Sequence, residues 1–166
     1  MKVGKVIVKV VEALAFVGSV AGVAYLGNKA LKKETELKER YKSYYMLTNQ
    51  WLLNRNAGRS IEEYFSQNDI ESIAIYGMGT LGELFYQEVK KTNVTVKAFI
   101  DRNADEIYYG LDNLAIVNLE RLNEIEKVDA IVVTPVFDFD DINEEIRNSG
   151  TSCKVISLED IIYDIV

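Results

Sequence analysis

The pattern of apolar positions divides the chain into a helical first part and a second part in which short strands alternate with helices. Short apolar runs rich in β-formers occur at Ser72–Tyr76, Val94–Ile100, Leu114–Val117, Asp129–Thr134 and Lys154–Ile156. The segments between them have helical spacing or helix-capping residues. Strands that alternate with helices predict an α/β fold with a parallel sheet, and we expect the strand order 3-2-1-4-5.

Two helical segments precede the predicted sheet. Val6–Leu26 is almost uninterrupted apolar sequence, and residues 30–55 contain neither glycine nor proline. In the second segment one helical stripe recurs at spacings of three and four, formed by Leu37, Tyr41, Tyr44, Thr48 and Trp51 and widened by Tyr45 and Leu52. We expect this stripe to pack against the domain that follows, and a dimer seam is the alternative. Gly58 ends this helix, and Ser60 caps a short one that runs through Phe65.

Charge is distributed unevenly along the chain, whose net charge is −7. Residues 1–33 contain six lysines and one glutamate, whereas residues 69–166 contain eight basic and twenty acidic residues. An acidic body repels a phosphate backbone, so nucleic acid is excluded as a partner. The lysines flank the apolar segment, and this arrangement favours a membrane anchor that spans the bilayer or lies on it. A signal peptide cleaved near Gly22-Val23-Ala24 and an ordinary packed helix are the alternatives.

The amino-acid composition excludes several types of catalytic and metal site. The chain has no histidine and one cysteine, Cys153, which excludes histidine-based catalytic triads, histidine zinc sites and thiolate metal cages. Tyr86 and Lys90 match the Tyr-x-x-x-Lys spacing of short-chain dehydrogenases, but they follow the glycine motif too closely to reach a nicotinamide ring. The acidic run Asp138–Asp141 is explained by the preference of a helix's first turn for acids. We therefore expect no metal site.

The strongest motif joins the first predicted strand to the helix after it. Ser72–Tyr76 leads directly into Gly77-Met78-Gly79-Thr80-Leu81-Gly82, a complete G-x-G-x-x-G. In such a motif Gly77 permits a tight turn, Gly79 allows a diphosphate to approach the backbone, and Gly82 lets the helix lie close to the strands. Asp101 lies 19 residues beyond Gly82, at the end of the second strand, where a carboxylate accepts ribose hydroxyls.

These features predict a Rossmann-like domain with a nucleotide site between the ends of the first and fourth strands. The expected binding residues are Gly77, Met78, Gly79, Thr80, Leu81, Gly82, Asp101, Arg102 and Thr134. Asp101 favours NAD over NADP because a carboxylate repels a 2′-phosphate, and the neighbouring Arg102 reduces that preference. A glycine turn that only holds helix against sheet is the alternative. The predicted organisation is a hydrophobic helix at 1–29, an amphipathic helical connector at 30–68 and the Rossmann-like nucleotide-binding domain at 69–166.

Residues 41–166 resemble a Rossmann-like domain of bacterial surface-polysaccharide proteins. The resemblance rests on the tyrosine- and tryptophan-containing helix YKSYYMLTNQW and on IAIYGMGTLG, AFIDRN, VDAIVVTPVFDFDDI and VISLEDII. Related domains occur fused to, or beside, glycosyltransferases and sugar-modifying enzymes. The resemblance implies a nucleotide, nucleotide-sugar or dinucleotide ligand and carries over Gly77, Gly79, Gly82 and Asp101. It supplies no catalytic residue.

We therefore expect a nucleotide-binding module of surface-polysaccharide biosynthesis at the bacterial cytoplasmic membrane, with its domain facing the cytoplasm. Its ligand would be NAD or a nucleotide-sugar, and its protein partner a second copy or a glycosyltransferase. One alternative is a small NAD-dependent oxidoreductase or sugar-nucleotide epimerase that completes its site by oligomerisation. Its acid–base groups would come from Tyr76, Tyr108, Tyr109 or Lys97. The other alternative is a structural protein with a vestigial glycine loop.

Overall fold

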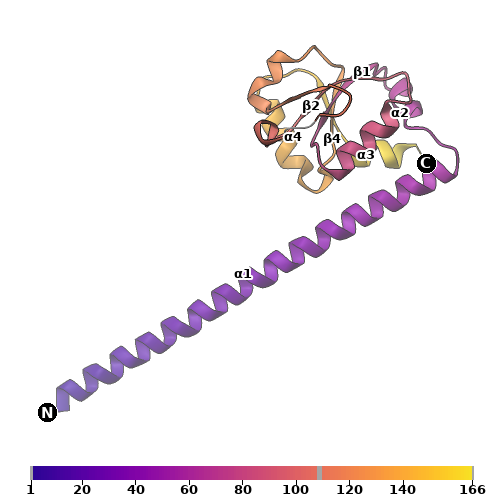
Figure 1. Ribbon diagram of the computed structural model, residues 1–166. Helices are drawn as coiled ribbons and strands as arrows, with labels where there is room; N and C mark the ends of the chain where they lie inside the picture. The colour runs from indigo at the N-terminus through magenta and orange to yellow at the C-terminus, as the bar shows by residue number, and fades with distance from the viewer. Residues whose placement is uncertain (1, 108–109, 166) are drawn as a thin grey trace. The chain divides into compact units, whose positions relative to one another are not determined.

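The structure is a computed structural model that describes the backbone of residues 2–107 and 110–165, with side chains from residue 25 onward in these ranges. The chain forms two compact units, residues 1–42 and 43–166. In chain order the elements are α1 Lys2–Asn56, α2 Ile61–Gln67, β1 Ser72–Tyr76, α3 Thr80–Val89, β2 Thr95–Ile100, η1 Ala104–Glu106, β3 Ala115–Val117, η2 Leu119–Glu124, β4 Ala130–Val133, η3 Val136–Asp138, α4 Phe139–Asn148, β5 Lys154–Ser157 and α5 Leu158–Asp164 (Figure 1).

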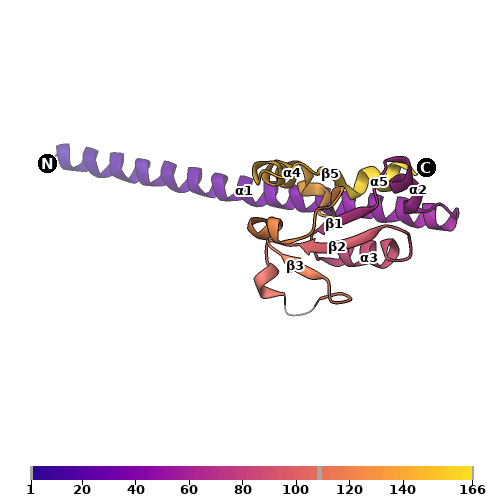
Figure 2. The same ribbon diagram turned by 90° about the horizontal axis from the view of Figure 1, so that it is seen from above.

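The second unit is built on a parallel sheet of five strands in the order β3-β2-β1-β4-β5, which confirms the predicted fold class and order. Strand β1 is central and pairs with β2 on one side and β4 on the other. Figure 2 shows β1, β2 and β3 side by side. We call the edge formed by the C-terminal ends of the strands the carboxyl edge, and the opposite edge the amino edge. In open α/β sheets ligands bind at the carboxyl edge, where the strand order reverses.

Both faces of the sheet are buried, as expected for parallel strands. Alternate residues of β1 point to opposite faces, so Ile73 and Ile75 belong to one apolar cluster and Ala74 and Tyr76 to the other. The first cluster is covered by α2, α3, α5 and the end of α1. The second is covered by α4, through Ile142 and other residues, and by partly buried side chains of η2. Because η2 is only a short 3₁₀ helix, α4 provides most of the cover on that face.

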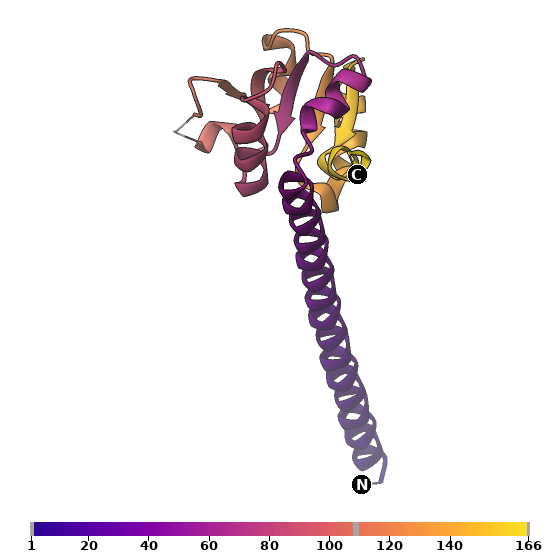
Figure 3. The ribbon, with the colours of Figure 1, turned by 90° about the vertical axis from the view of Figure 1, so that its right-hand side faces the viewer.

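Helix α1 runs without interruption from Lys2 to Asn56, so the two helical segments predicted from the sequence form one element (Figure 3). The predicted packing stripe is only partly correct. Trp51 is buried and Tyr44 is half-buried against the core, whereas the other members, Leu37, Tyr41 and Thr48, and the flanking Tyr45 and Leu52 are exposed. Leu47, outside the stripe, is fully buried. Leu37 and Tyr41 precede residue 43, where the sheet unit starts. Within that unit the buried face of the helix follows Tyr44, Leu47, Trp51 and Asn54, at spacings of three and four, so the neighbouring positions stay exposed.

Two polar side chains fix the end of α1 within the sheet unit. The indole N–H of Trp51 donates to Glu88 Oε2 on α3 at 2.7 Å, and its ring meets Phe85 edge-on. Asn54 is fully buried, and its amide Nδ2 donates to the backbone oxygen of Ile162 on α5 at 2.7 Å. A buried amide must be bonded to avoid a desolvation cost, so Asn54 specifies how this segment packs.

Within the part of the chain whose side chains are described, no helix has the length and apolar content needed to cross a membrane. The anchor predicted at Val6–Leu26 lies almost entirely outside that part, because side chains before residue 25 are not described.

Candidate functional site

The loop between β1 and α3, residues 77–79 and hereafter the glycine loop, requires glycine at its first position. Gly77 has φ +94°, in the left-handed region that disfavours a side chain. A Cβ there would also lie 2.9 Å from both Pro135 Cδ and Thr134 Oγ1, in the loop after β4. The N–H of Gly77 donates to the carbonyl of Ile100, at the end of β2, at 2.7 Å. The turn is therefore held between the neighbouring strands on both sides.

Gly82, in the first turn of α3, is required for a different reason. A Cβ at Gly82 would overlap the carbonyl oxygen of Gly77, a backbone atom that cannot move aside without disturbing the turn. The glycine lets the helix begin directly against the loop. Gly77 and Gly82 are thus both explained by the fold, with no reference to a ligand.

Gly79 is not explained in this way. Its φ is −87°, it is exposed, and nothing lies within 4 Å of the position that a Cβ would occupy. It is the N-cap of α3 but provides no side-chain cap. The N–H groups of Thr80, Leu81 and Gly82 have no acceptor among the described residues. An uncapped helix N-terminus with open space in front of it is suited to an anion, because free N–H groups and the helix dipole both favour negative charge.

The side chains around this N-terminus differ in what they can offer a ligand. Met78 is buried and Leu81 is half-buried against the core, so these two residues can contribute only backbone groups. Thr80 is exposed in the first turn of α3, and its hydroxyl can donate or accept there.

Asp101 comes directly after β2 and contacts the glycine loop. Its Oδ2 accepts the N–H of Met78 at 2.8 Å, and its Oδ1 accepts the N–H of Asn103 at 2.8 Å. An ionised carboxylate has about four acceptor positions, so both oxygens can still accept a ligand hydroxyl. The sequence predicted this acid at the end of β2. The structure shows in addition that its carboxylate holds the glycine loop through the N–H of Met78.

Thr134, another predicted binding residue, is 2 % exposed and faces inward. Its hydroxyl lies 3.0 Å from the carbonyl oxygen of Tyr76 and 3.1 Å from that of Gly77, and its single proton can serve either acceptor. The structure therefore brings Thr134 to the loop as predicted, but its side chain holds the backbone and is shielded from a ligand.

Arg102 extends from the end of β2 to α4, where its Nη2 donates to Glu145 Oε1 at 2.7 Å. This bond raises the pKa of the guanidinium. An arginine is charged at physiological pH in any case. Both side chains of the pair are about half exposed, at 58 % and 47 %. An exposed ion pair of this kind contributes only about 0–1 kcal/mol to stability, so Arg102 can leave Glu145 for another anion at little cost in free energy.

Tyr76, the last residue of β1, is 3 % exposed, and its hydroxyl has no hydrogen-bond partner among the described residues. Burial raises its pKa and the charge of Arg102 partly opposes this, so the group stays a neutral donor at physiological pH. An unsatisfied buried hydroxyl costs about 1–3 kcal/mol. The sequence identified Tyr76 only as an acid–base candidate, since no local pattern shows that a hydroxyl lacks a partner.

The other acid–base candidates are accounted for separately. Lys97 Nζ donates to Glu126 Oε2 at 2.6 Å, while Tyr108 and Tyr109 lie outside the described residues. The dehydrogenase-like pair Tyr86 and Lys90 bonds instead to Asp112, at 2.8 and 3.2 Å. Burial and the bond to Asp112 raise the pKa of Tyr86 to about 12. This pair therefore fastens the loop before β3 to α3.

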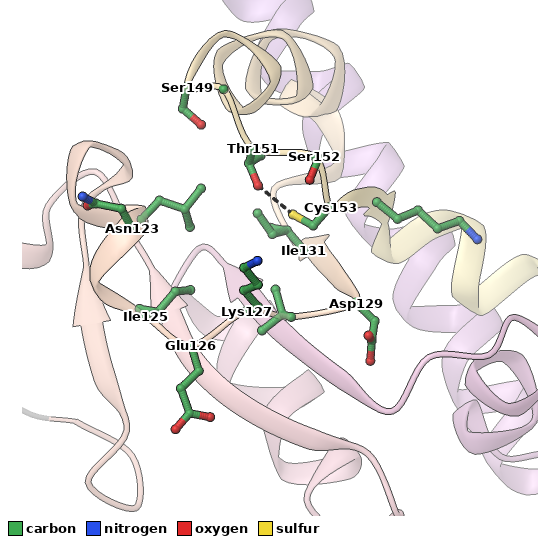
Figure 4. Close-up of a pocket in the computed structure, with 14 residues that line it drawn as sticks. Asn123, Ile125, Glu126, Lys127, Asp129, Ile131, Ser149, Thr151, Ser152 and Cys153 are labelled. Carbon is green, nitrogen blue, oxygen red and sulfur yellow. Dashed lines mark hydrogen bonds between the residues drawn. The ribbon is translucent and has the colours of Figure 1, made fainter.

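A cavity of about 610 Å³ lies at the amino edge, away from the glycine loop (Figure 4). It is bounded by the segments that lead into β4 and β5, and Thr151 Oγ1 and Cys153 Sγ lie 3.2 Å apart in its wall. In the described part of the chain, no group of three or more acidic, histidine or cysteine residues is arranged to hold a metal ion.

Comparison with known families matches residues 69–157 to a family model described as C2185-like, N-terminal. The matched range begins just before β1 and ends with β5, so it contains the whole sheet, the glycine loop and Asp101. Comparison with curated proteins finds no match.

Proposed function

The chain belongs to the C2185-like, N-terminal family, and we propose that this member binds a phosphate-bearing nucleotide-type ligand at the glycine loop. The observation that carries the proposal is Gly79. Two of the three glycines are required by packing, whereas Gly79 faces open space at an uncapped helix end. A glycine that the protein itself does not need there is explained by the close approach of a phosphate.

The residues around the loop fit a nucleotide. The N–H groups of Thr80, Leu81 and Gly82 would hold a phosphate, and Asp101 would accept the ribose hydroxyls. These donors are fixed in advance by the bonds of Gly77, Met78 and Thr134, so binding would not have to order the loop. NAD and nucleotide-sugars both carry the phosphate and ribose that such a site recognises.

The decisive variant is Gly79→Asp. Aspartate is a favoured N-cap, so the free energy of unfolding should be unchanged or slightly higher, while its carboxylate would occupy the donors and repel a phosphate. Ser60→Asp places the same residue at the N-cap of α2, outside the site, and serves as the matched control. Calorimetric titration of the full chain with NAD, NADP and UDP-sugars should show binding by the wild type and by Ser60→Asp but not by Gly79→Asp. Absence of wild-type binding at millimolar concentrations would refute the proposal.

The identity of the ligand would also test the biological setting. We propose a role in surface-polysaccharide biosynthesis because residues 41–166 resemble domains associated with that process. Preferential binding of a UDP-sugar supports this role, whereas preferential binding of NAD supports a dinucleotide function outside it.

We propose in addition that Val6–Leu26 tethers the protein to the cytoplasmic face of a bacterial membrane. The support is the apolar length of the segment and the lysines that flank it. Anionic lipid would attract these lysines and repel the acidic domain, which would be held off the membrane surface. The full chain should sediment with membranes and resist a high-salt wash, while a chain that begins at Lys33 should remain in the supernatant. Release by salt alone would indicate a peripheral electrostatic contact instead.

A further inference from the structure

The cavity of about 610 Å³ described above, hereafter the amino-edge cavity, lies beside a connection that forms no full helix. Parallel strands are usually joined by an α-helix that covers the sheet. Between β3 and β4, residues 118–129 form only the short 3₁₀ helix η2, so this part of the sheet is covered less completely. The apolar wall of the cavity consists of the half-buried Leu122, Ile125 and Val128 and the buried Ile131. A volume of this size accommodates a small organic molecule.

Four of the residues that line the cavity are charged, and three of these already have partners. Glu126 Oε2 accepts Lys97 Nζ at 2.6 Å. The carboxylate of Asp129 accepts N–H groups at the start of β1, and Lys154 Nζ donates to Asn68 Oδ1 at 3.1 Å. Figure 4 shows that the side chains of Glu126 and Asp129 point away from the cavity. These three charged groups are therefore bonded within the protein.

Lys127 is the fourth charged residue of the lining and differs from the other three. Its ammonium has no hydrogen bond or ion pair with any residue whose side chain is described. In Figure 4 it points toward the space below Thr151 and Cys153. Residues 69–166 contain eight basic and twenty acidic residues, so a cation without a carboxylate partner is unexpected in this part of the chain. A free ammonium directed into a cavity with an apolar wall suits a ligand that carries one negative charge.

The loop between α4 and β5 contributes neutral polar groups to the same cavity. Thr151 and Ser152 both line it, and their backbone N–H groups have no acceptor among the described residues. The Ser152 side chain is exposed, and its hydroxyl can donate or accept. A carboxylate has about four acceptor positions on its two oxygens, so it can bond to an ammonium and to neutral donors at the same time.

We propose that the amino-edge cavity binds a small organic acid, whose apolar body packs on Leu122, Ile125 and Val128 and whose carboxylate bonds to Lys127. The charge of the domain favours a single carboxylate. A ligand with several negative charges, such as a nucleotide, is repelled more strongly by the twenty acidic residues of 69–166. The cavity lies at the edge of the sheet opposite the glycine loop, so this site is independent of the proposed nucleotide site.

The test compares ligands that have the same apolar chain and differ in charge. Calorimetric titration of the full chain should give the wild type a dissociation constant at least about 10-fold lower for octanoate than for octanamide, since one hydrogen bond between charged groups contributes about that much. Lys127→Gln should weaken octanoate binding by about the same 10-fold and leave octanamide binding unchanged. Lys91→Gln removes an exposed lysine that does not line the cavity and should change neither.

Two further variants test the charge and the apolar wall separately. Lys127→Glu should bind octylammonium more tightly than octanoate, which reverses the order of the wild type. Leu122→Ala should weaken octanoate and octanamide binding equally, by about 3-fold, because it removes apolar surface that both ligands contact. Thermal unfolding without ligand checks that each variant is folded, and substitutions of the exposed Lys127 should leave the midpoint unchanged.

Three results would overturn the inference. They are a wild type that binds no octanoate at millimolar concentration, a wild type that binds octanoate and octanamide equally, and a Lys127→Gln protein that binds octanoate like the wild type. The Gly79→Asp protein should still bind octanoate with the affinity of the wild type. Failure of the glycine-loop site and failure of the amino-edge cavity are thereby distinguished.

Discussion

Each end of β1 is tied to a neighbouring strand by an aspartate, and the two ends differ in what lies beyond the tie. At the carboxyl edge Asp101 follows β2 and accepts the N–H of Met78 in the glycine loop. At the amino edge Asp129 precedes β4, and its Oδ2 accepts the N–H groups of Glu71 and Ser72 and the Ser72 hydroxyl. Both carboxylates hold a neighbouring segment by hydrogen bonds. Of the two, only Asp101 lies beside a helix end whose first N–H groups have no acceptor among the described residues.

The amino edge has a cavity, whereas the carboxyl edge has a helix end without a side-chain cap. The cavity of about 610 Å³ at the amino edge is lined by residues of η2, by loop residues and by the starts of β4 and β5. A binding site for a phosphate needs fixed N–H groups at a helix end more than it needs volume. The proposed site at the carboxyl edge therefore rests on the free N–H groups of a helix end and not on the size of a cavity.

The largest predicted effect on stability comes from a substitution at Gly82, one of the glycines at the carboxyl edge. Gly82→Ala should lower the free energy of unfolding by at least about 3 kcal/mol, because the new Cβ overlaps the Gly77 carbonyl oxygen. Urea denaturation followed by circular dichroism measures this. A loss below about 1 kcal/mol would mean that the loop can shift, and the carboxyl edge would then be less rigid than described.

The next effect compares the two aspartates directly. Asp101→Ala leaves the N–H groups of Met78 and Asn103 without their acceptor in a half-buried position, and it should cost about 2 kcal/mol of unfolding free energy. Asp129→Ala should cost less, because Asp129 is exposed and water can solvate the donors that it releases. Equal losses in parallel denaturation experiments would remove the distinction between the edges.

Gly79→Ala should have a much smaller effect on stability, within about 1 kcal/mol of the wild type in either direction. Its φ of −87° suits alanine, and nothing lies within 4 Å of the new Cβ. In the same variant the affinity for a bound nucleotide should fall by about 10-fold, because the methyl group stands where a phosphate approaches. A large loss of stability would show that Gly79 is structural after all.

The smallest effect is a pH dependence at the amino edge. Hydrogen bonds from the Ser72 hydroxyl and from the N–H groups of Glu71 and Ser72 lower the pKa of Asp129. A carboxyl whose pKa is lower in the folded state stabilises the fold above its unfolded pKa of about 4, and this stabilisation is lost as pH falls through the folded value. Between pH 7 and pH 3 the wild type should therefore lose more unfolding free energy than Asp129→Asn. Parallel pH curves for the two proteins would show that these bonds contribute nothing.

The sequence was sufficient for the features that depend on local pattern. The five strands, their order and the glycine turn follow from short apolar runs and from the three motif glycines, which determine conformation within a few residues. Individual side-chain bonds between residues far apart in the sequence could not be predicted. Asp129 bonds to Ser72, 57 residues away, and Arg102 bonds to Glu145, 43 residues away.

The error in the α1 stripe has a similar cause. Helical periodicity shows that one face of a helix is apolar, but it does not show where along the helix a packing partner begins. Tyr41 and Tyr44 belong to the same stripe, yet only Tyr44 lies within the sheet unit and packs on its core. The burial of Leu47 could be recognised only from the packed sheet unit.

The bonding of the glycine loop also determines how fast its amide hydrogens exchange with solvent. The amides of Gly77 and Met78 are bonded to Ile100 and Asp101, so they should exchange slowly, at a rate set by opening of the turn. The amides of Thr80, Leu81 and Gly82 have no acceptor among the described residues and should exchange within the fastest phase. A phosphate seated on α3 would slow these three and leave Gly77 and Met78 nearly unchanged. Deuterium uptake along eight consecutive residues, 76–83, would thus record both the fold of the loop and its occupancy, without a labelled ligand or an assay of activity.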